Sequence, residues 1–244
     1  MFAAIQALFG ALIYRPLYNA LVFVVGVLPT HDVGIAVIVL TIVVRFLLFP
    51  LSRRAVQAQL AMKKIAPEVE KLKEKYKGKP EEEGKAIFAL YKERDVHPFA
   101  GVALMLIQLP IILGLYMVLS RGGLPKIDAS FLYSFVHLPS AVNMEFLGII
   151  NMASRSIPLA ILAAISQFFY TRLSMGPTET SSPVEASLSG DMARSFEIQA
   201  RYVLPVIVGA IGFSLAAAAP LYWTVGNTFM IIQEYLSGRR FRGT

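Results

Sequence analysis

A single arginine inside a long apolar run constrains this chain more than any other feature. Val33–Pro50 (VGIAVIVLTIVVRFLLFP) holds one ionisable side chain, that of Arg45. A helix of about 20 residues crosses a bilayer core of about 30 Å, and a charge at that depth costs about 2.5 kcal/mol or more. Arg45 must therefore reach an interface, meet a partner or face water, and that choice bears directly on function.

The composition predicts an α-helical membrane protein that crosses the bilayer several times. Hydrophobic residues make up 56% of the chain, and the mean hydropathy is +0.60, both above the values of ordinary soluble domains. The net charge of +7 is unevenly placed, because twelve of the 23 lysines and arginines lie in Arg53–Arg94. Such clustering is typical of membrane orientation, so we expect no specific nucleic acid. The absence of cysteine excludes disulfides and thiol catalysis.

The apolar runs predict an all-α polytopic membrane protein with a five-helix transmembrane core. The expected spans are residues 31–51, 98–120, 156–173, 202–219 and 220–236, with Pro220 separating the last two. Residues 1–30 are apolar but interrupted at Arg15-Pro16. We expect them to form an N-terminal amphipathic helix in the extracytoplasmic interface; a spanning helix is the alternative.

The polar segments between these spans set the orientation. Positive charge gathers in residues 52–97, 174–201 and 237–244, which we place in the cytoplasm as a helical hairpin, a loop and a basic tail. Residues 121–155 then form an extracytoplasmic interfacial loop. The N-terminus is expected outside and the C-terminus in the cytoplasm.

The cytoplasmic segment 52–97 has the pattern of two antiparallel helices. Apolar residues recur at helical spacing on both sides of a turn signal at Gly78-Lys79-Pro80. They are Ile65, Val69, Leu72 and Tyr76 before the turn and Ile87, Leu90 and Tyr91 after it. Two interpretations stay open: a solvated pair that only sets topology, or a docking arm for a protein or for anionic lipid headgroups.

No catalytic constellation is evident, and we expect neither an enzyme nor a cofactor. His31, His97 and His137 lie far apart without metal-ligand spacing, and no nucleophile or phosphate-binding motif occurs. Polar residues within the spans, such as Gln108 and Gln167, are individually typical of interhelical hydrogen bonds.

Arg45 is less easily explained as a packing residue. Thr41 shares its helix face, while Glu234 near the end of the last span is the one acid within the apolar runs, the first of which is Val33–Pro50. Because guanidinium stays charged, the economical arrangement is a water-filled cavity open to the cytoplasm.

Several spaced segments resemble the YidC/Oxa/Alb membrane protein insertase family. They are VVRFLLFPL, ALYKERDVHPFAG, LIQLPIILGLYMVL, LPVIVGAIGF and APLYWTVGNTFMIIQEYL, and the resemblance runs from about Phe9 to Arg240. It implies five core helices around a hydrophilic groove open to the cytoplasm and to lipid. The groove arginine falls on Arg45, and the lining falls on Gln108, Gln167, Trp223 and Asn227.

The resemblance also implies location and partners. We expect a monomer in the bacterial plasma membrane that receives nascent membrane proteins and works with the ribosome, the signal recognition pathway, the Sec translocon and lipids. Gram-negative members of the family have an additional N-terminal span and a large periplasmic domain, and Gram-positive members often begin with a lipoprotein signal; we expect neither here. The short tail argues against tight tethering of ribosomes through it.

Two other functions compete with insertion. A small secondary transporter or channel would use Arg45 to bind an anion, although the chain shows no pair of related halves of the kind such transporters often have. An assembly chaperone without translocation activity is the third interpretation.

Overall fold

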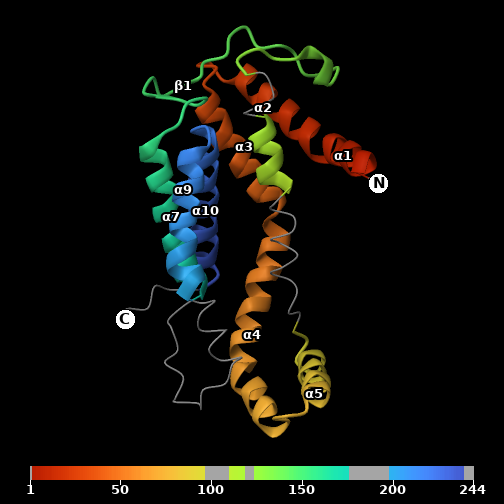
Figure 1. Cartoon of the computed structure of the whole chain (residues 1–244). Helices are drawn as coiled ribbons and strands as arrows, with labels where there is room; N and C mark the ends of the chain where they lie inside the picture. The colour runs from red at the N-terminus through yellow and green to blue at the C-terminus, as the bar shows by residue number, and fades with distance from the viewer. Residues whose placement is uncertain (1, 97–109, 119–123, 176–197, 239–244) are drawn as a thin grey trace. The chain divides into compact units, whose positions relative to one another are not determined.

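The computed structural model describes residues 2–96, 110–118, 124–175 and 198–238 (Figure 1). The described chain is predominantly helical and divides into two compact units. Unit 1 combines Met1–Phe46 with Ile111–Thr244, and unit 2 is Leu47–Pro110. Among the described residues, an all-α architecture is interrupted by a two-stranded antiparallel pair, β1 (Glu145–Phe146) with β2 (Ile150–Asn151), and by an isolated bridge between Asp32 and Asn143.

The N-terminal segment is one continuous helix rather than two stretches interrupted at Arg15-Pro16. α1 (Phe2–Phe9) passes through a π-helical turn (Gly10–Tyr14) into α2 (Arg15–Val27). The N–H of Arg15 donates to the carbonyl of Gly10 across this wider turn. Pro16 follows directly in the first turn of α2, so the wider turn lies where the chain reaches a residue without an N–H to donate.

By length and composition, two described helices are apolar enough to cross a membrane. They are Gln6–Val27 and Ile157–Met175, and a third span results if Val33–Leu47 and Phe49–Met62 form one broken span. A membrane protein is therefore supported, while the five-helix core stays a prediction. Gln6–Val27 meets the length requirement of the spanning alternative, so the interfacial placement of residues 1–30 also stays a prediction.

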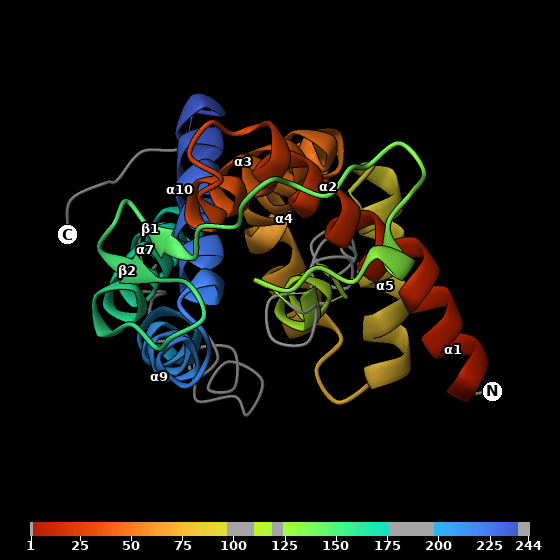
Figure 2. The same ribbon diagram turned by 90° about the horizontal axis from the view of Figure 1, so that it is seen from above.

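The helical packing of unit 1 centres on α7 (Ile157–Met175). α7 packs against both α9 (Leu204–Ser214) and α10 (Ala218–Leu236), and the three helices lie side by side in Figures 1 and 2. The chain breaks at Leu215–Ala217, between α9 and α10, and not at Pro220. Pro220 instead occupies the first turn of α10, where its missing N–H has no intrahelical partner to lose.

The apolar core of unit 1 joins α2, α3 (Val33–Leu47), the helix at 110–118 and the start of α10. Tyr18, Leu21 and Val22 of α2 are fully buried, as are Val33 and Val37 of α3. Asp32 begins α3: its Oδ1 accepts from the N–H of Ile35 at 3.0 Å, and its Oδ2 accepts from the N–H of Leu147 at 2.9 Å. This carboxylate therefore caps a helix and ties the β1–β2 turn to it.

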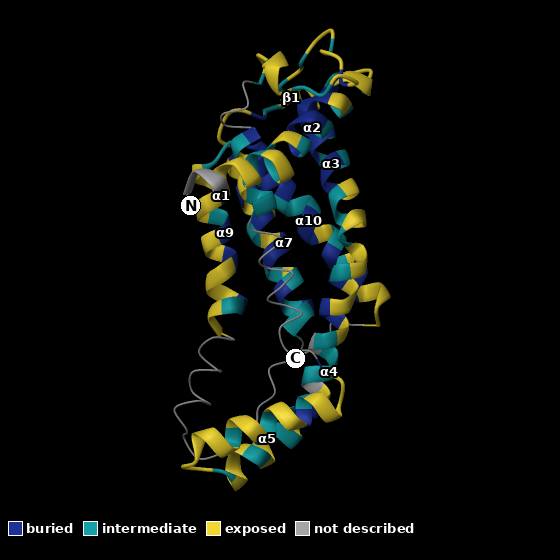
Figure 3. Ribbon diagram, turned by 90° about the vertical axis from the view of Figure 1, so that its right-hand side faces the viewer, coloured by how far each residue is buried: buried dark blue, intermediate teal, exposed yellow. Residues whose placement is uncertain are grey.

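Unit 2 contains two helices joined by a tight turn. α4 (Phe49–Lys75) ends before Gly78, whose φ of +85° favours glycine, and α5 (Pro80–Glu93) follows. Arg94 donates to Glu68 at 2.8 Å across the pair, and this carboxylate raises the pKa of Arg94. Ile65 of α4 and Leu90 of α5 are buried, whereas most of α5 is exposed (Figure 3).

A substitution at Gly34 tests how β1 and the turn after it pack against α3. A Cβ at Gly34 would collide with Phe146, so Gly34→Ala should destabilise the protein by about 1–3 kcal/mol through overpacking. Thermal unfolding in detergent, followed by circular dichroism, measures the change. The control is Gly84→Ala in α5, where nothing lies within 4 Å; helix propensity predicts a gain of about 0.5–1 kcal/mol there. Equal effects at the two positions would contradict this account.

Candidate functional site

Arg45 lies in the last turn of α3, with its guanidinium against α10. The side chain is half-buried, and its Nε is shielded from solvent with no hydrogen-bond partner. A Cβ placed on Gly226 would lie 2.6 Å from Nη2 of Arg45, so the absence of a side chain there makes room for the guanidinium. Within the described residues, no ion pair involves Arg45. The charge therefore sits at a helix–helix contact that does not neutralise it.

Thr41 lies one turn before Arg45 and is fully buried. Its hydroxyl donates to the carbonyl of Val37 at 2.6 Å, a bond within the same helix that satisfies the donor locally. The hydroxyl oxygen can still accept a hydrogen bond on the face of α3 that Thr41 shares with Arg45. Thr41 thus adds a polar atom to the α3 face without adding a charge.

A hydrogen-bonded amide pair joins α7 to α10. Asn227 Nδ2 donates to Gln167 Oε1 at 3.1 Å and to Ser166 Oγ at 3.2 Å. Gln167 Nε2 in turn donates to Thr171 Oγ1 at 3.1 Å, and all four side chains are buried. The structure therefore brings together two of the residues expected to line one site, although they are 60 positions apart.

α10 connects the arginine with this amide network. Gly226 and Asn227 are consecutive, so their positions differ by about 100° around the helix axis. One faces Arg45 of α3 and the other faces Gln167 of α7. Polar groups from three helices are consequently arranged on neighbouring faces of α10, a relation that sequence periodicity within any one helix does not show.

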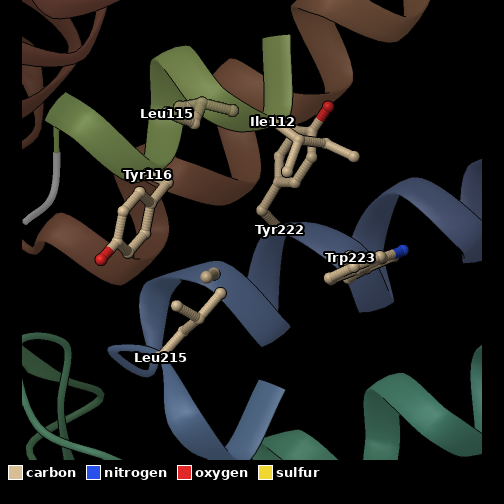
Figure 4. Close-up of a pocket in the computed structure, with 7 residues that line it drawn as sticks. Ile112, Leu115, Tyr116, Leu215, Tyr222 and Trp223 are labelled. Atoms are coloured by element: carbon tan, nitrogen blue, oxygen red, sulfur yellow. The ribbon is translucent and has the colours of Figure 1, made fainter. Parts of the chain in front are cut away.

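Trp223, expected as part of the polar and aromatic lining of the groove, has apolar neighbours. It borders a small cavity between α10 and the helix at 110–118, shown in Figure 4. The other lining residues are Ile112, Leu115, Tyr116, Leu215, Ala219 and Tyr222. Such a cavity fits an apolar side chain better than a charged one.

Two positions complete the comparison with the expected site. Gln108 lies outside the described residues. Gly226 was not predicted, although a glycine directly before a polar residue in an otherwise apolar helix is a recognisable signal of close approach. Within the described part of the chain, no cluster of three or more histidines and acids is placed to hold a metal ion.

The amide pair is expected to stabilise the contact between α7 and α10. Asn227→Ala leaves the buried Gln167 Oε1 without its donor, which should cost about 1–3 kcal/mol of unfolding free energy. Chemical or thermal unfolding in detergent measures the loss. Thr228→Ala is the matched control, because Thr228 is exposed and its hydroxyl bonds only to Thr224 O of its own helix. Loss of equal size in both variants would refute the pairing.

Similarity to known proteins extends over most of the chain. The family model described as "60Kd inner membrane protein" matches residues 26–243. "Membrane protein insertase YidC 1" of Listeria monocytogenes serotype 4b (strain F2365) is 30% identical over 214 residues, which cover 86% of this chain and 65% of the relative. "Membrane protein insertase YidC" of Clostridium tetani is 28% identical over 209 residues, covering 86% and 83%.

Coverage of these relatives is uneven. The chain spans just under two thirds of the Listeria protein's length. "Membrane protein insertase YidC" of Oleidesulfovibrio alaskensis is 29% identical over 221 residues, which cover 91% of this chain and 37% of that protein.

Proposed function

Because the chain belongs to the 60Kd inner membrane protein family, the YidC/Oxa1/Alb3 family, we propose that it is a membrane protein insertase. Its substrates are nascent membrane proteins, and their polar flanking segments enter a hydrophilic groove that holds Arg45. The names of the relatives support a role in membrane protein insertion. The environment of Arg45 supports this part of unit 1 as the place where the substrate enters.

The observation that carries this proposal is the guanidinium at the contact between α3 and α10. Arg45 Nε has no partner, and no carboxylate of the described residues pairs with the side chain. A guanidinium does not release its proton to escape an apolar environment. With no partner for the charge among the described residues, we assign that role to water in a groove or to an acidic residue of an entering substrate.

The neighbouring polar groups extend this environment across α10. Thr41 Oγ1 can accept a further hydrogen bond beside Arg45, whereas the amides of Gln167 and Asn227 already bond to each other. We therefore assign Arg45 the role of attracting substrate, with Thr41 beside it. Gln167 and Asn227 hold α7 and α10 in place, and Trp223 offers an apolar contact.

Insertion then needs no nucleotide at this site. A charge in surroundings of low polarity acts on an opposite charge far more strongly than it does in water. Arg45 draws the polar or acidic tail of a substrate into the groove, which shortens the apolar distance the tail must cross. Transfer of about 20 apolar residues into lipid supplies the driving force.

Orientation and partners follow from the charge distribution. We place the N-terminus outside a bacterial plasma membrane and residues 52–97 in the cytoplasm, because this segment carries twelve of the 23 lysines and arginines. The segment 52–97 is then positioned to meet ribosomes, the signal recognition pathway or the Sec translocon. Anionic lipid headgroups are the alternative contact of its basic residues.

Replacement of Arg45 tests the groove charge. In liposomes that contain only this protein, Arg45→Ala should reduce insertion of a single-span substrate with an acidic translocated tail by about tenfold, the effect of losing roughly 1.4 kcal/mol. Arg45→Lys keeps the charge and should retain most activity. Protease protection of the tail measures insertion.

Two further variants separate the charge from general damage. Arg53→Ala removes an exposed arginine of α4 and should leave insertion unchanged. Gly226→Ala keeps Arg45 but displaces its guanidinium, and should reduce insertion of acidic tails more than of neutral ones. Equal insertion by wild type and Arg45→Ala would refute the groove charge, and anion flux without insertion would favour the transporter.

Deletion of Lys63–Lys92 tests the docking role of unit 2. The deletion removes about half of α4 and nearly all of α5, and should weaken co-sedimentation of ribosome–nascent chain complexes with proteoliposomes. Glu68→Gln is the milder control, since it removes only the exposed ion pair to Arg94, worth about 0–1 kcal/mol. Unchanged recruitment by the deletion variant would instead support a simple topology anchor.

A further inference from the structure

The segment 124–156 connects the helix at 110–118 to α7 and presents large apolar side chains to the outside. It lies across one end of the helices of unit 1, as Figures 1 and 2 show. The exposed fraction is 69% for Phe135, 57% for Leu138, 63% for Leu147 and 79% for Ile149. Exposed apolar side chains gathered on one ordered segment indicate an interaction surface.

The composition of this segment favours lipid as the partner. Residues 129–144 (ASFLYSFVHLPSAVNM) contain no aspartate, glutamate, lysine or arginine. A water-facing loop normally carries such residues. Phe131, Tyr133 and Phe135 belong to a class of side chain that suits the boundary between headgroups and acyl chains.

Backbone hydrogen bonds place the segment at the level where apolar helices end. The N–H of Val33, the first residue of α3, donates to Asn143 O at 2.9 Å. The N–H of Ala217, just before α10, donates to Ser154 O at 2.7 Å, and α7 begins at Ile157. Where spanning helices end, the surroundings change from hydrocarbon to interface.

Side chains of α2 hold one edge of the segment. Asn19 is 2% exposed; its Nδ2 donates to Phe131 O at 2.9 Å, and its Oδ1 accepts from the N–H of Tyr133 at 2.6 Å. Tyr18 Oη accepts from the N–H of Asp128 at 2.8 Å. Arg15 Nε donates to Phe131 O at 3.0 Å. We call Arg15, Tyr18 and Asn19 the α2 clamp.

The α2 clamp satisfies backbone polar groups that would otherwise need water. A backbone can approach lipid only when its N–H and C=O groups have partners within the protein. Here the polar bonds of residues 128–133 point to α2, while Phe135 and Leu138, a few residues further on, are exposed. The clamp therefore allows an irregular segment to lie in the interface.

We propose that residues 128–138 form a lipid anchor, held by the α2 clamp, whose Phe135 and Leu138 enter the leaflet at that end of the spans. Asn19 is its main positioning residue. The anchor goes beyond insertase activity and does not depend on Arg45, so the two proposals fail independently.

The single tryptophan of the chain permits a direct test of lipid contact. In a Trp223→Phe background, Phe135→Trp places the sole tryptophan in the anchor. In liposomes with acyl-brominated phosphatidylcholine, we expect blue-shifted emission and severalfold stronger quenching by bromine than by aqueous acrylamide. Phe88→Trp in α5 is the matched reporter, because Phe88 is 64% exposed and outside the anchor.

The outcomes of this test are distinct. Emission from Phe135→Trp that acrylamide quenches and brominated lipid does not would overturn the anchor, and would indicate water or a protein partner at this surface. The Phe88→Trp reporter sets the response expected of an exposed aromatic in unit 2.

The clamp is tested in the same reporter. Tyr18→Phe keeps the ring but removes the acceptor for Asp128, and Asn19→Ala removes both of its bonds to the segment; each should lower bromine quenching and raise acrylamide quenching. Thr228→Ala and Arg45→Ala should leave the reporter unchanged. If Tyr18→Phe and Asn19→Ala also leave it unchanged while circular dichroism shows a folded protein, the positioning role is refuted.

Discussion

The contact of the Arg45 guanidinium with α10 constrains how α3 and α10 pack, because this charge forms no ion pair within the described residues. Its charge persists in apolar surroundings, so the protein must leave it space and polarity. Gly226 provides the space, because a Cβ there would lie 2.6 Å from Nη2 of Arg45. Side chains bridge α3 and α10 beside it, as in the ring pair Phe46–Phe229, whose centroids are 5.3 Å apart.

α10 has two polar contacts that begin at consecutive residues. Gly226 faces a charge that has no ion-pair partner within the described residues, whereas Asn227 faces a network whose donors and acceptors satisfy one another. The second face is stable because its polar groups are paired, and it keeps α7 and α10 in a defined register. Under the proposed function, the first face is where water or substrate would meet Arg45. α10 thus contacts the charge of α3 on one face and the amide network of α7 on the other.

Polar and apolar groups are arranged in the opposite way in the segment 124–156. There the side chains of α2 satisfy the backbone, and the apolar side chains are left outside. Asp32 attaches the segment to α3 at a second point, because its carboxylate caps α3 and also accepts a hydrogen bond from the N–H of Leu147. Both ends of this segment are therefore fixed to helices, and the position of its exposed aromatic residues follows from buried polar contacts.

Local features were readable from the sequence, because helical periodicity, turn residues and apolar length act over a few positions. They predicted a helical membrane protein, the shared face of Thr41 and Arg45, and the glycine turn at Gly78. Contacts between helices depend on rotation and packing, which one sequence does not specify. Only the tertiary structure showed that Asn227 bonds to Gln167 and that Gly226 lies against Arg45. It also placed the helix break at Leu215–Ala217 instead of Pro220. The hydrogen bond from the N–H of Tyr133 to Asn19, far apart in the chain, was likewise visible only there.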